Sequence, residues 1–418
     1  MRGGTVRDGA PPVEEPPWRP VPLAAAPPVR GRITADVAIV GAGLTGLATA
    51  HHLLRRDPGL DVVLLDAAGP AAGASGRGTG LVGPRIGPAI DRARKRFGDE
   101  TARACYLASE DWVRQTVELA EELGADCGLT TDGQLIVATT GPAEERLAAQ
   151  AEAYRQLGLA VEPVDRPGRF RAALRHPVAA TLDPAALTTA LAADLARRGL
   201  RRFDHSPVRT LGGGELDCPD GTVRARHTVI AVNGFTRSLR LPVGTVAPLQ
   251  LHAVATAPLT AADRALIGPE AVIDATTLAP YYRLTPDGRL VMGGGPVRIP
   301  PTTDPAAHRR GWDWLARRLP VPAAVTHRWT GQVGMTGDDL PVVGRIDEHT
   351  WYAGGCCGHG LALATATGRH LAEALTGEAP PPLPWHRERA PWLPVTGPAA
   401  PLLRGYLRFL AHQAGRTR

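Results

Sequence analysis

A short glycine-rich segment restricts the fold of this chain more than any other stretch. The apolar run Val37–Val40 is followed by Gly41-Ala-Gly-Leu-Thr-Gly46, then by residues with helical periodicity that end at Arg56, and then by a second apolar run, Val62–Leu65. This order predicts a strand, a helix and a second strand. Because two strands joined by a helix lie parallel in one sheet, we expect an α/β fold.

The spacing of the three glycines is that of a dinucleotide-binding turn. Gly41 permits the tight turn, Gly43 lets the backbone approach a pyrophosphate, and Gly46 lets the helix pack closely on the strand. Asp66 closes the second apolar run, where a carboxylate can accept hydrogen bonds from ribose hydroxyls and disfavours a 2′-phosphate. We therefore expect a dinucleotide to contact Gly41, Ala42, Gly43, Leu44, Thr45, Gly46, Asp66 and Ala67.

Composition excludes several classes of enzyme and partner. The single lysine, Lys95, lies in an arginine-rich run, so neither a pyridoxal-phosphate Schiff base nor a Gly-Lys-Ser/Thr phosphate loop can be built. The formal net charge of +6 comes from scattered arginines and aromatic residues make up only 5% of the chain, so we expect no nucleic-acid partner. Hydrophobic residues make up 44% of the 418 residues, enough for a large core.

The cysteines and the apolar segments indicate the compartment. The five cysteines form no Cys-x-x-Cys pair, which favours reduced thiols and no metal site, and we expect Cys356 and Cys357 to be small packing residues. The N-terminal region lacks the apolar stretch of a signal peptide, and no run is long enough to span a membrane. We expect a cytoplasmic protein, and the sequence gives no oligomeric state.

Changes in the residue pattern along the chain predict its domains. Prolines crowd residues 1–32, which predicts an extended arm. Strand-like runs interrupt the dinucleotide-binding pattern, so we expect two domains: a Rossmann-type domain and an inserted, mostly antiparallel sheet that holds the substrate. The Rossmann-type domain is predicted to comprise residues 33–100, 159–240 and 329–378, the substrate domain residues 101–158 and 241–328, and a proline-rich link with a final helix residues 379–418.

Two further glycine-rich segments fit the same cofactor. In the segment Gly73–Gly80, backbone amides with Ser75 or Arg77 could hold a pyrophosphate or a flavin edge. Near the C-terminus, residues 351–360 run from a strand into a helix, and the helix N-terminus at Gly358-His-Gly360 would stabilise negative charge on a reduced flavin. The remaining glycine runs, Gly212–Gly214 and Gly293–Gly295, lack the spacing of a second dinucleotide turn, so one dinucleotide serves the whole chain.

Together these motifs resemble those of the D-amino-acid-oxidase and glycine-oxidase superfamily of FAD enzymes, and in particular its γ-glutamylputrescine-oxidase-like branch. The resemblance covers about residues 15–378 and is carried by Asp36–Asp66, Gly73–Arg77, Val229–Thr236, Tyr282–Arg289, Asp339–Pro341 and Gly358–Gly360. It implies that the Rossmann-type domain binds FAD. It also implies FAD contacts from Gly73, Ser75, Gly76, Arg77, Gly78, Thr79, Val208, Asn233, Gly234, Gly358, His359, Gly360 and Leu361.

The resemblance implies a reaction as well as a cofactor. In this family a neutral amine loses a hydride from its α-carbon to flavin N5, water hydrolyses the resulting imine, and oxygen or another acceptor reoxidises the flavin, giving hydrogen peroxide from oxygen. An FAD-dependent amine oxidase or dehydrogenase is therefore expected, with a small-molecule amine as substrate. Its candidate catalytic residues are His359, His252, Tyr282 and Arg283.

Two of these candidates leave alternatives open. His359 could polarise the flavin or only bond its own glycine turn. Neighbouring residues on a strand point to opposite faces, so at most one of Tyr281 and Tyr282 can face the flavin.

Departures from the family pattern narrow the expected substrate. Glycine oxidases carry a carboxylate-binding arginine where this chain has Gln332 or Val333. A free amino acid would lose its bidentate anchor, so we expect amines without an α-carboxylate to be preferred. Arg283 could undo this inference if the inserted sheet carries it into the pocket.

The same comparison predicts non-covalent FAD. Relatives that link the flavin to cysteine do so where this chain has Gly334-Met-Thr336, and those that use histidine do so within residues 67–90, which contain none. Some relatives use a lysine to promote reaction with oxygen, and Lys95 lies outside that region. The choice between oxidase and dehydrogenase therefore stays open.

Three further alternatives stay open. They are an amino-acid oxidase or dehydrogenase of the same fold, an FAD-retaining subunit that acts only with a modification partner, and a flavin monooxygenase reduced by a nicotinamide. The final helix, Leu402–Leu410, could pack on the protein itself, on a partner subunit or on a membrane surface.

Overall fold

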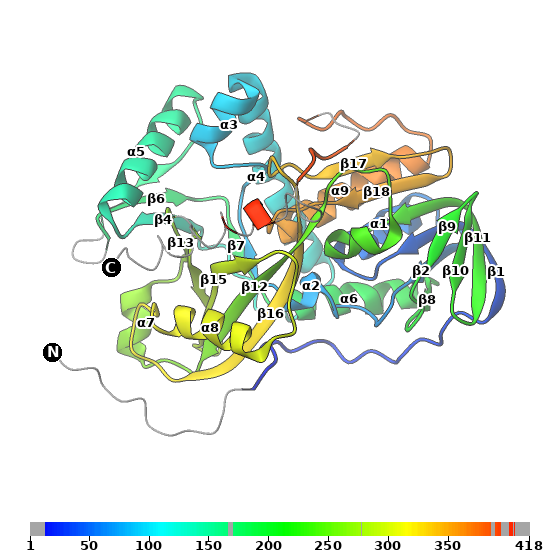
Figure 1. The fold of residues 1–418 in the computed structure, drawn as a ribbon, viewed down its shortest axis with the longest axis horizontal. Coiled ribbons are helices and arrows are strands. Elements are labelled where there is room, and N and C mark those ends of the chain that lie inside the picture. The colour runs from blue at the N-terminus through cyan, green and yellow to red at the C-terminus, as the bar shows by residue number, and fades with distance from the viewer. Residues whose placement is uncertain are drawn as a thin grey trace.

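The computed structural model describes residues 13–165, 170–276, 278–385, 389–393, 401–403 and 405. Within these residues the chain forms two eight-stranded sheets and one small two-stranded sheet. In Figure 1 the first sheet, with β1 and β2, lies to the right, and the second sheet, with β13 and β15, lies to the left. The predicted α/β class with two domains is confirmed.

The first sheet is built on the predicted strand-helix-strand unit. β1 (Gly31–Val40) pairs in parallel with β2 (Val62–Leu65), and α1 (Leu44–Arg56) joins them. The strand order is β17-β18-β11-β1-β2-β8, with β10 and β9 attached beside β11. The other strands of this sheet are β8 (Arg201–Phe203), β9 (Thr210–Gly212), β10 (Glu215–Cys218), β11 (Gly221–Ile230), β17 (Val342–Arg345) and β18 (Thr350–Gly354).

The second sheet has the order β16-β12-β15-β14-β13-β4-β6-β5. Its neighbouring strands pair antiparallel, except that β4 and β13 run parallel. Its strands are β4 (Gln134–Ala138), β5 (Glu162–Pro163), β6 (Ala172–His176), β12 (Ala247–Thr256), β13 (Ala271–Asp274), β14 (Tyr281–Leu284), β15 (Leu290–Arg298) and β16 (Val325–Met335). The small sheet pairs β3 (Leu81–Val82) with β7 (Ala180–Thr181).

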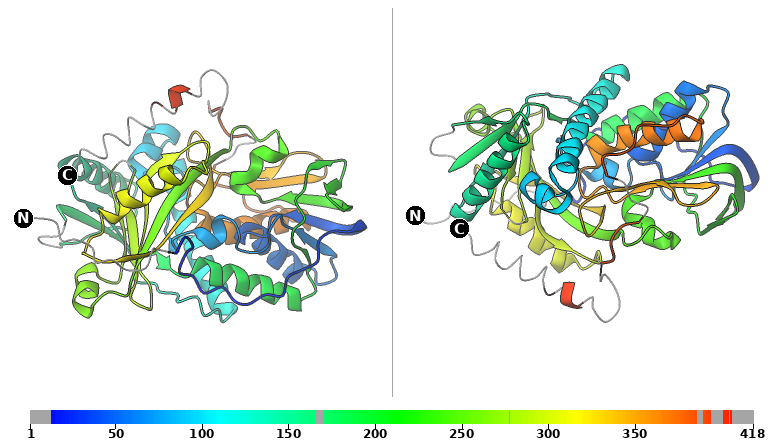
Figure 2. Two further views of the ribbon diagram at one scale, coloured as in Figure 1. Left: turned by 60° about the horizontal axis from the view of Figure 1, so that its bottom comes forward. Right: turned by 90° about the horizontal axis from the view of Figure 1, so that it is seen from above.

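Both faces of the first sheet are covered, which explains the unbroken apolar run at the end of β1. Val37 and Ile39 join a core with α1, α6 (Pro184–Arg197) and α9 (Gly360–Leu375), whereas Ala38 and Val40 join a separate core that includes residues of β10 and β11. Figure 2 shows α6 and α9 packed along this sheet. A strand buried on both faces loses the polar alternation of a half-exposed strand.

The second sheet carries its own core. Trp312, Trp314 and Leu315 of α8 (Pro305–Ala316) pack with Val254, Val272 and other apolar residues of the strands. The remaining helices are α2 (Ala74–Arg77), α3 (Ile90–Phe97), α4 (Asp99–Glu122), α5 (Gly141–Gln156), α7 (Ala261–Ile267) and the 3-10 helix η1 (Asn233–Leu239).

The strand pairing differs from the predicted division at three places. β5 and β6 lie within residues 159–240, predicted for the FAD-binding domain, but they hydrogen-bond beside β4 in the second sheet. Residues 329–335, also predicted there, form most of β16 and pair with β12. α4, predicted for the substrate domain, places Val113 and Leu119 in the core of the first sheet. The local pattern of apolar and polar residues cannot show which distant strands will pair.

Residues 13–30 form the predicted extended arm, which lies along both sheets. Val13 exchanges two backbone hydrogen bonds with β16. Trp18 donates from Nε1 to the carbonyl of Gly78, and its ring meets that of Trp329 edge-on at 5.9 Å between centroids. Further along, backbone N–H groups of the arm donate to the side chains of Asp183, Thr189, Asp204 and Ser206.

Among the described residues, no helix is long and apolar enough to cross a membrane. Most of the predicted C-terminal helix, residues 402–410, lies outside the described part of the chain. Its packing stays a prediction.

Candidate FAD and substrate site

One large cavity, of about 1120 Å³, lies between the two sheets. On one side it is lined by the segments that follow β1 and β2 and by the start of α9, and on the other by residues of β12, β14 and β16. All the predicted cofactor residues line it except Gly46 and Gly76. These two are packing positions, because a Cβ at Gly46 would lie 2.0 Å from the Gly41 carbonyl oxygen and one at Gly76 would lie 1.9 Å from that of Ala71.

The turn after β1 leaves the start of α1 open to the cavity. Gly41 has φ +112°, and a Cβ there would lie 2.6 Å from the carbonyl oxygen of Ala231, so only glycine fits. Gly43 has an ordinary φ, and a Cβ there would meet only Ser75 Oγ, at 3.1 Å. The N–H groups of the first helical turn have no intrahelical acceptor, and Gly43, Leu44 and Thr45 of this turn line the cavity.

Asp66 is tied to the glycine turn. Its Oδ2 accepts the N–H of Ala42 at 2.7 Å, and its Oδ1 accepts those of Ala68 and Gly69, both at 2.8 Å. A carboxylate offers about four acceptor positions, so one remains on Oδ2 for a ligand hydroxyl. Asp66 therefore shapes the turn as well as offering an acceptor to the cavity.

The segment of α2 connects the turn to the second sheet. Ser75 Oγ accepts the N–H of Leu44 at 2.9 Å, at the start of α1. Arg77 lines the cavity, and its Nε donates to the carbonyl of Thr330 in β16 at 2.6 Å. The side chains predicted to hold a pyrophosphate or a flavin edge thus lie where the two sheets meet.

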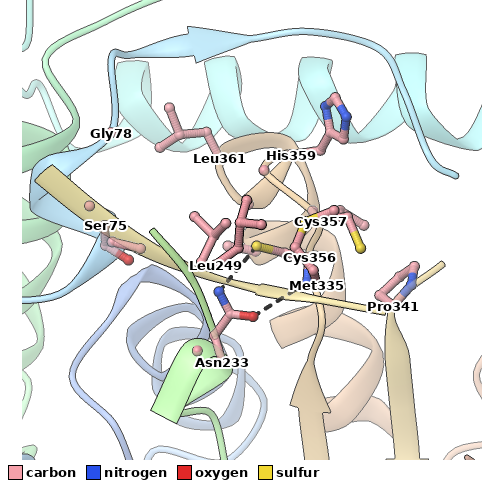
Figure 3. Close-up of a pocket in the computed structure, with 18 of the residues that line it drawn as sticks. Ser75, Gly78, Asn233, Leu249, Met335, Pro341, Cys356, Cys357, His359 and Leu361 are labelled. Atoms are coloured by element: carbon pink, nitrogen blue, oxygen red, sulfur yellow. Dashed lines mark hydrogen bonds between the residues drawn. The ribbon is translucent and has the colours of Figure 1, made fainter. Parts of the chain in front are cut away.

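Asn233 fixes the turn before α9. Its Oδ1 accepts the N–H groups of Gly355 at 3.0 Å and Cys356 at 3.3 Å, and its Nδ2 donates to Cys356 Sγ at 3.2 Å (Figure 3). This turn aims the N-terminus of α9, at Gly360 and Leu361, into the cavity. The helix end contributes a positive partial charge there.

Comparison with known proteins identifies the family of this chain. The family model described as DAO, FAD dependent oxidoreductase, matches residues 36–374. The chain belongs to this FAD-dependent oxidoreductase family. FAD is accordingly its cofactor, as the sequence predicted.

Two curated relatives of this oxidoreductase cover most of its length. It is 30% identical over 379 residues to a probable oxidoreductase OrdL of Rhizobium meliloti (strain 1021), an alignment that covers 87% of each chain. It is 29% identical over 368 residues to the gamma-glutamylputrescine oxidoreductase of Escherichia coli (strain K12), covering 83% of this chain and 85% of that protein. The crystal structure of glycine oxidase from Geobacillus kaustophilus shares the fold, with a TM-score of 0.69 at 23% identity over 83% of this chain and 96% of that one.

The cavity of the oxidoreductase fits FAD on three counts. Gly43 leaves a cradle that a side chain would fill, the N-termini of α1 and α9 supply N–H donors for anionic or carbonyl groups, and Asp66 offers an acceptor. The residues that would hold the pyrophosphate lie at the start of α1 and in α2. Those that would meet the flavin ring lie at the start of α9 and along β12 and β16.

His359 is a neutral side chain at this site. Burial, with a smaller contribution from the nearby Arg85 guanidinium, lowers its pKa to about 3. In Figure 3 its ring points away from Asn233, on the far side of the turn. At neutral pH its ring can therefore donate one hydrogen bond and accept another, but it adds no positive charge to the cavity.

The structure does not support catalytic roles for the other three candidates. The Tyr282 ring lies in the core of the second sheet, whereas its neighbour Tyr281 lines the cavity, as strand alternation requires. His252 is among the residues that line the cavity, but its ring packs against His308 and Trp312 of α8, and burial lowers its pKa to about 4.

Arg283 is also placed away from the substrate. It is 1% exposed, and its guanidinium donates to three carbonyl groups, those of Thr79 at 2.7 Å, Leu182 at 2.6 Å and Leu284 at 3.1 Å. It lies over the Trp18 ring at 5.2 Å. Arg283 therefore locks the arm and the second sheet to the cofactor-binding segment and leaves no guanidinium fork for a ligand.

Several cavity residues were not predicted from the sequence. Arg85 follows β3, and Tyr106, Tyr154 and His176 come from α4, α5 and β6. Tyr106 Oη and His176 Nδ1 are 2.5 Å apart, and burial lowers the pKa of His176 to about 4, so this pair is neutral. No local motif marks these four residues, because they come from one loop, two helices and one strand that lie far apart in the sequence.

Proposed function

We propose that the protein oxidises a C–N bond of a primary or secondary amine. The substrate would give an imine, which water hydrolyses to a carbonyl compound and an amine or ammonia. FAD held by the start of α1 and by Asp66 would supply the acceptor for the hydride of the substrate α-carbon, and oxygen or another acceptor would take up the electrons. The relative from Escherichia coli is a gamma-glutamylputrescine oxidoreductase, which supports an amine substrate for this chain.

The observation that carries this proposal is the continuity of the cavity. The same space is lined by the cradle at Gly43 and by Leu249, Leu251 and Tyr281 of the second sheet. A substrate enclosed by these side chains would lie against the cofactor with little water around it. Exclusion of water strengthens the electrostatic influence of the α9 N-terminus.

We further propose that FAD is held without a covalent bond. Cys356 and Cys357 line the cavity, but burial raises the pKa of both thiols, that of Cys357 to about 12. Cys357 Sγ also lies 3.4 Å from Thr336 Oγ1 and donates to the carbonyl of Gly355 at 3.1 Å. Protonated thiols are weak nucleophiles, which supports packing roles for both residues.

The test is anaerobic reduction of the bound flavin by amines in the absence of a nicotinamide. Loss of the visible flavin absorption with a primary or secondary amine is the expected result. Reduction by NADPH alone would instead indicate a monooxygenase. If the protein retains FAD but no amine reduces it, the better explanation would be that the protein is a subunit that acts only with a modification partner.

A further inference from the structure

We propose that Gln134, Gln150 and Tyr154 form a second recognition site within the cavity, for a neutral group of the substrate that both donates and accepts hydrogen bonds. This inference rests on the proposed function, because the group would belong to the amine that the protein oxidises. The three residues come from β4 and α5, whereas the flavin-facing residues of the second sheet come from β12 and β16. We call these three residues the distal site.

Neighbouring contacts join the distal site into one wall of the cavity. Gln150 and Tyr154 are four residues apart in α5, which places their side chains on the same face of the helix. The Tyr154 ring meets the His176 ring edge-on at 5.1 Å between centroids, and His176 is the cross-strand partner of Gln134. Paired residues place their side chains on the same face of a sheet. The three side chains therefore line one region of the cavity, where α5 lies beside β4 and β6 (Figure 1).

The side chains of the distal site are buried, yet they keep unused hydrogen-bonding groups. Gln134 is 6% exposed, Gln150 8% and Tyr154 5%. Within the described part of the chain, none of these three side chains forms a hydrogen bond. A glutamine amide offers two donors and one acceptor carbonyl, and a tyrosine hydroxyl can donate and accept. Buried polar groups are rarely left without a partner, so water or a ligand in the cavity must satisfy these groups.

Two other glutamines that face the second sheet already have partners. Gln250, which is 8% exposed, exchanges two hydrogen bonds with the backbone of Thr302, each at 3.1 Å. Gln332 lines the cavity, but its Nε2 donates to the carbonyl of Gly234 at 2.9 Å, so the position at which glycine oxidases carry an arginine holds an engaged amide. The glutamines of the distal site differ, because no bond to the backbone accounts for them.

The electrostatics of this region favour a neutral group. Asp274 lines the cavity, but its Oδ1 accepts the N–H of Thr276 at 3.0 Å and its Oδ2 accepts the hydroxyl of Thr139. Arg146 is exposed, so solvent screens its charge, and its Nε donates to a backbone carbonyl at 2.7 Å. Burial raises the pKa of Tyr154, which is therefore neutral. The distal site thus offers polarity without charge.

The position of the distal site implies a long substrate. Tyr281 of β14 lines the cavity, and β13 lies between β14 and β4 in the second sheet. Two strand spacings of about 4.8 Å separate β14 from β4 by roughly 10 Å. A small amine beside Tyr281 cannot reach Gln134, whereas an amine with a chain of several carbons can. We therefore expect a substrate whose reacting end and far end are recognised by different elements.

The first test compares amines that differ only at the far end. The compounds 6-aminohexanamide, 6-aminohexanoate and 6-methylheptan-1-amine have ends of similar shape that are a neutral amide, an anion and an apolar group. In anaerobic flavin reduction the amide should be about ten- to a hundred-fold more efficient than the apolar amine, which leaves the buried amides unpaired. The acid is included because Arg85 acts electrostatically on Tyr154 from the loop after β3. Higher efficiency of the acid than of the amide would overturn the assignment of a neutral group.

Leucine, which is similar in size to glutamine, removes each amide without emptying the space. Gln134→Leu and Gln150→Leu should each lower efficiency with 6-aminohexanamide about two- to tenfold, mainly through binding, and leave 6-methylheptan-1-amine no worse than in the wild type. Gln156→Leu, at the exposed end of α5 outside the cavity, is the matched control and should change neither value.

The second test does not depend on turnover. Hexanamide, which lacks the amine, is titrated into the oxidised holoprotein and its binding is measured by calorimetry. It should bind the wild type and Gln156→Leu equally well. Its affinity should fall about two- to tenfold in Gln134→Leu and in Gln150→Leu, and further in the double variant, with equal FAD content in all five proteins.

The outcomes separate the two proposals. Equal efficiency of 6-aminohexanamide and 6-methylheptan-1-amine in the wild type, or a preference for the amide that persists in both leucine variants, would overturn the distal site and leave the amine-oxidation proposal intact. If none of the three amines reduces the flavin while hexanamide binding depends on Gln134 and Gln150, the distal site stands and the proposed reaction fails. If no amine reduces the flavin and hexanamide binds all five proteins equally or not at all, both proposals fail.

Discussion

Gly43 and Asp66 lie on the two sides of the cofactor cradle, and each acts through what surrounds it. Gly43 has no φ constraint and only Ser75 Oγ near its missing Cβ, so its role is to leave space. Asp66 accepts three backbone N–H groups, so its role is to hold the turn and to present one remaining acceptor. Their replacement should therefore have different effects.

Replacing Gly43 by valine should abolish FAD retention and leave the fold intact. The added side chain fills the cradle but meets only the movable Ser75 side chain of the protein. FAD content after gel filtration and far-UV circular dichroism measure the two effects, with Gly212→Val in β9, which meets nothing within 4 Å, as the control. Equal FAD content in the two variants would contradict the assignment of the cradle.

Asp66→Ala should weaken FAD binding, by roughly 1.5–3 kcal/mol for a charged hydrogen bond. It should also lower the melting temperature of the apoprotein, because three N–H groups lose their acceptor. Fluorescence titration of apoprotein with FAD gives the affinity. The control is Asp61→Ala, which removes a carboxylate near the other end of β2 that pairs with Arg201 outside the cavity; a comparable loss there would argue against a specific role for Asp66.

At the scale of elements, the arm behaves as part of the fold. Trp18 lies between the Trp329 ring and the Arg283 guanidinium, which are held by the second sheet. Trp18→Ala should therefore destabilise the protein by about 2 kcal/mol, somewhat less than a fully buried tryptophan. Chemical unfolding measures this change. Trp392, which is 72% exposed, provides the matched control, and equal stability of the two alanine variants would show that the arm contributes nothing.

The sequence predicted some elements well and the sheet membership of others poorly. The strand-helix-strand unit Asp36–Asp66 was predictable, because a glycine turn and an apolar period are local signals. The placement of β6 in the second sheet and of α4 on the first depends on contacts with residues far along the chain.

The residues of the site were likewise predictable where a local motif marks them and not where distant segments meet. The predicted residues next to a glycine turn line the cavity, whereas Arg85 and His176 were not predicted and the ring of the predicted Tyr282 lies in the core of the second sheet.

For the molecule as a whole, five histidines should dominate the pH dependence of stability between pH 6.5 and about 5. Burial lowers the pKa of His51, His176 and His252 to about 4 and that of His52 and His359 to about 3. The unfolded chain binds protons near pH 6.5 and the folded chain does not, so stability is complete above that pH and is lost as the pH falls.

For each buried histidine, the free energy of unfolding should fall by about 1.4 kcal/mol per pH unit below 6.5, until the pH reaches the pKa of the folded state. Burial raises the pKa of Asp274 and Glu110, which acts in the opposite direction but on fewer groups. Thermal melting at several pH values tests this expectation. His176→Gln should flatten the dependence, whereas His205→Gln, at an exposed position, should not. A melting temperature that stays constant from pH 7 to pH 5 would refute it.

The attachment of FAD is a property of the whole holoprotein and is tested by acid precipitation. The yellow colour should pass into the supernatant, because Cys356 and Cys357 are protonated and hydrogen-bonded. A yellow pellet would show a covalent link, and Cys356→Ser and Cys357→Ser would then identify the sulfur involved.

The arm also has a consequence for the order of folding. Its residues 13–30 leave the ribosome before the side chains of Asp183, Thr189, Asp204 and Ser206 that receive its N–H groups, and long before the β16 backbone that pairs with Val13. During synthesis Val13 must remain unpaired while more than 300 residues follow it, since it bonds to Thr326 and Arg328. The arm is thus among the last segments to gain all its native contacts, although it is synthesised first. Its full set of contacts can form only after the strands of both sheets are in place.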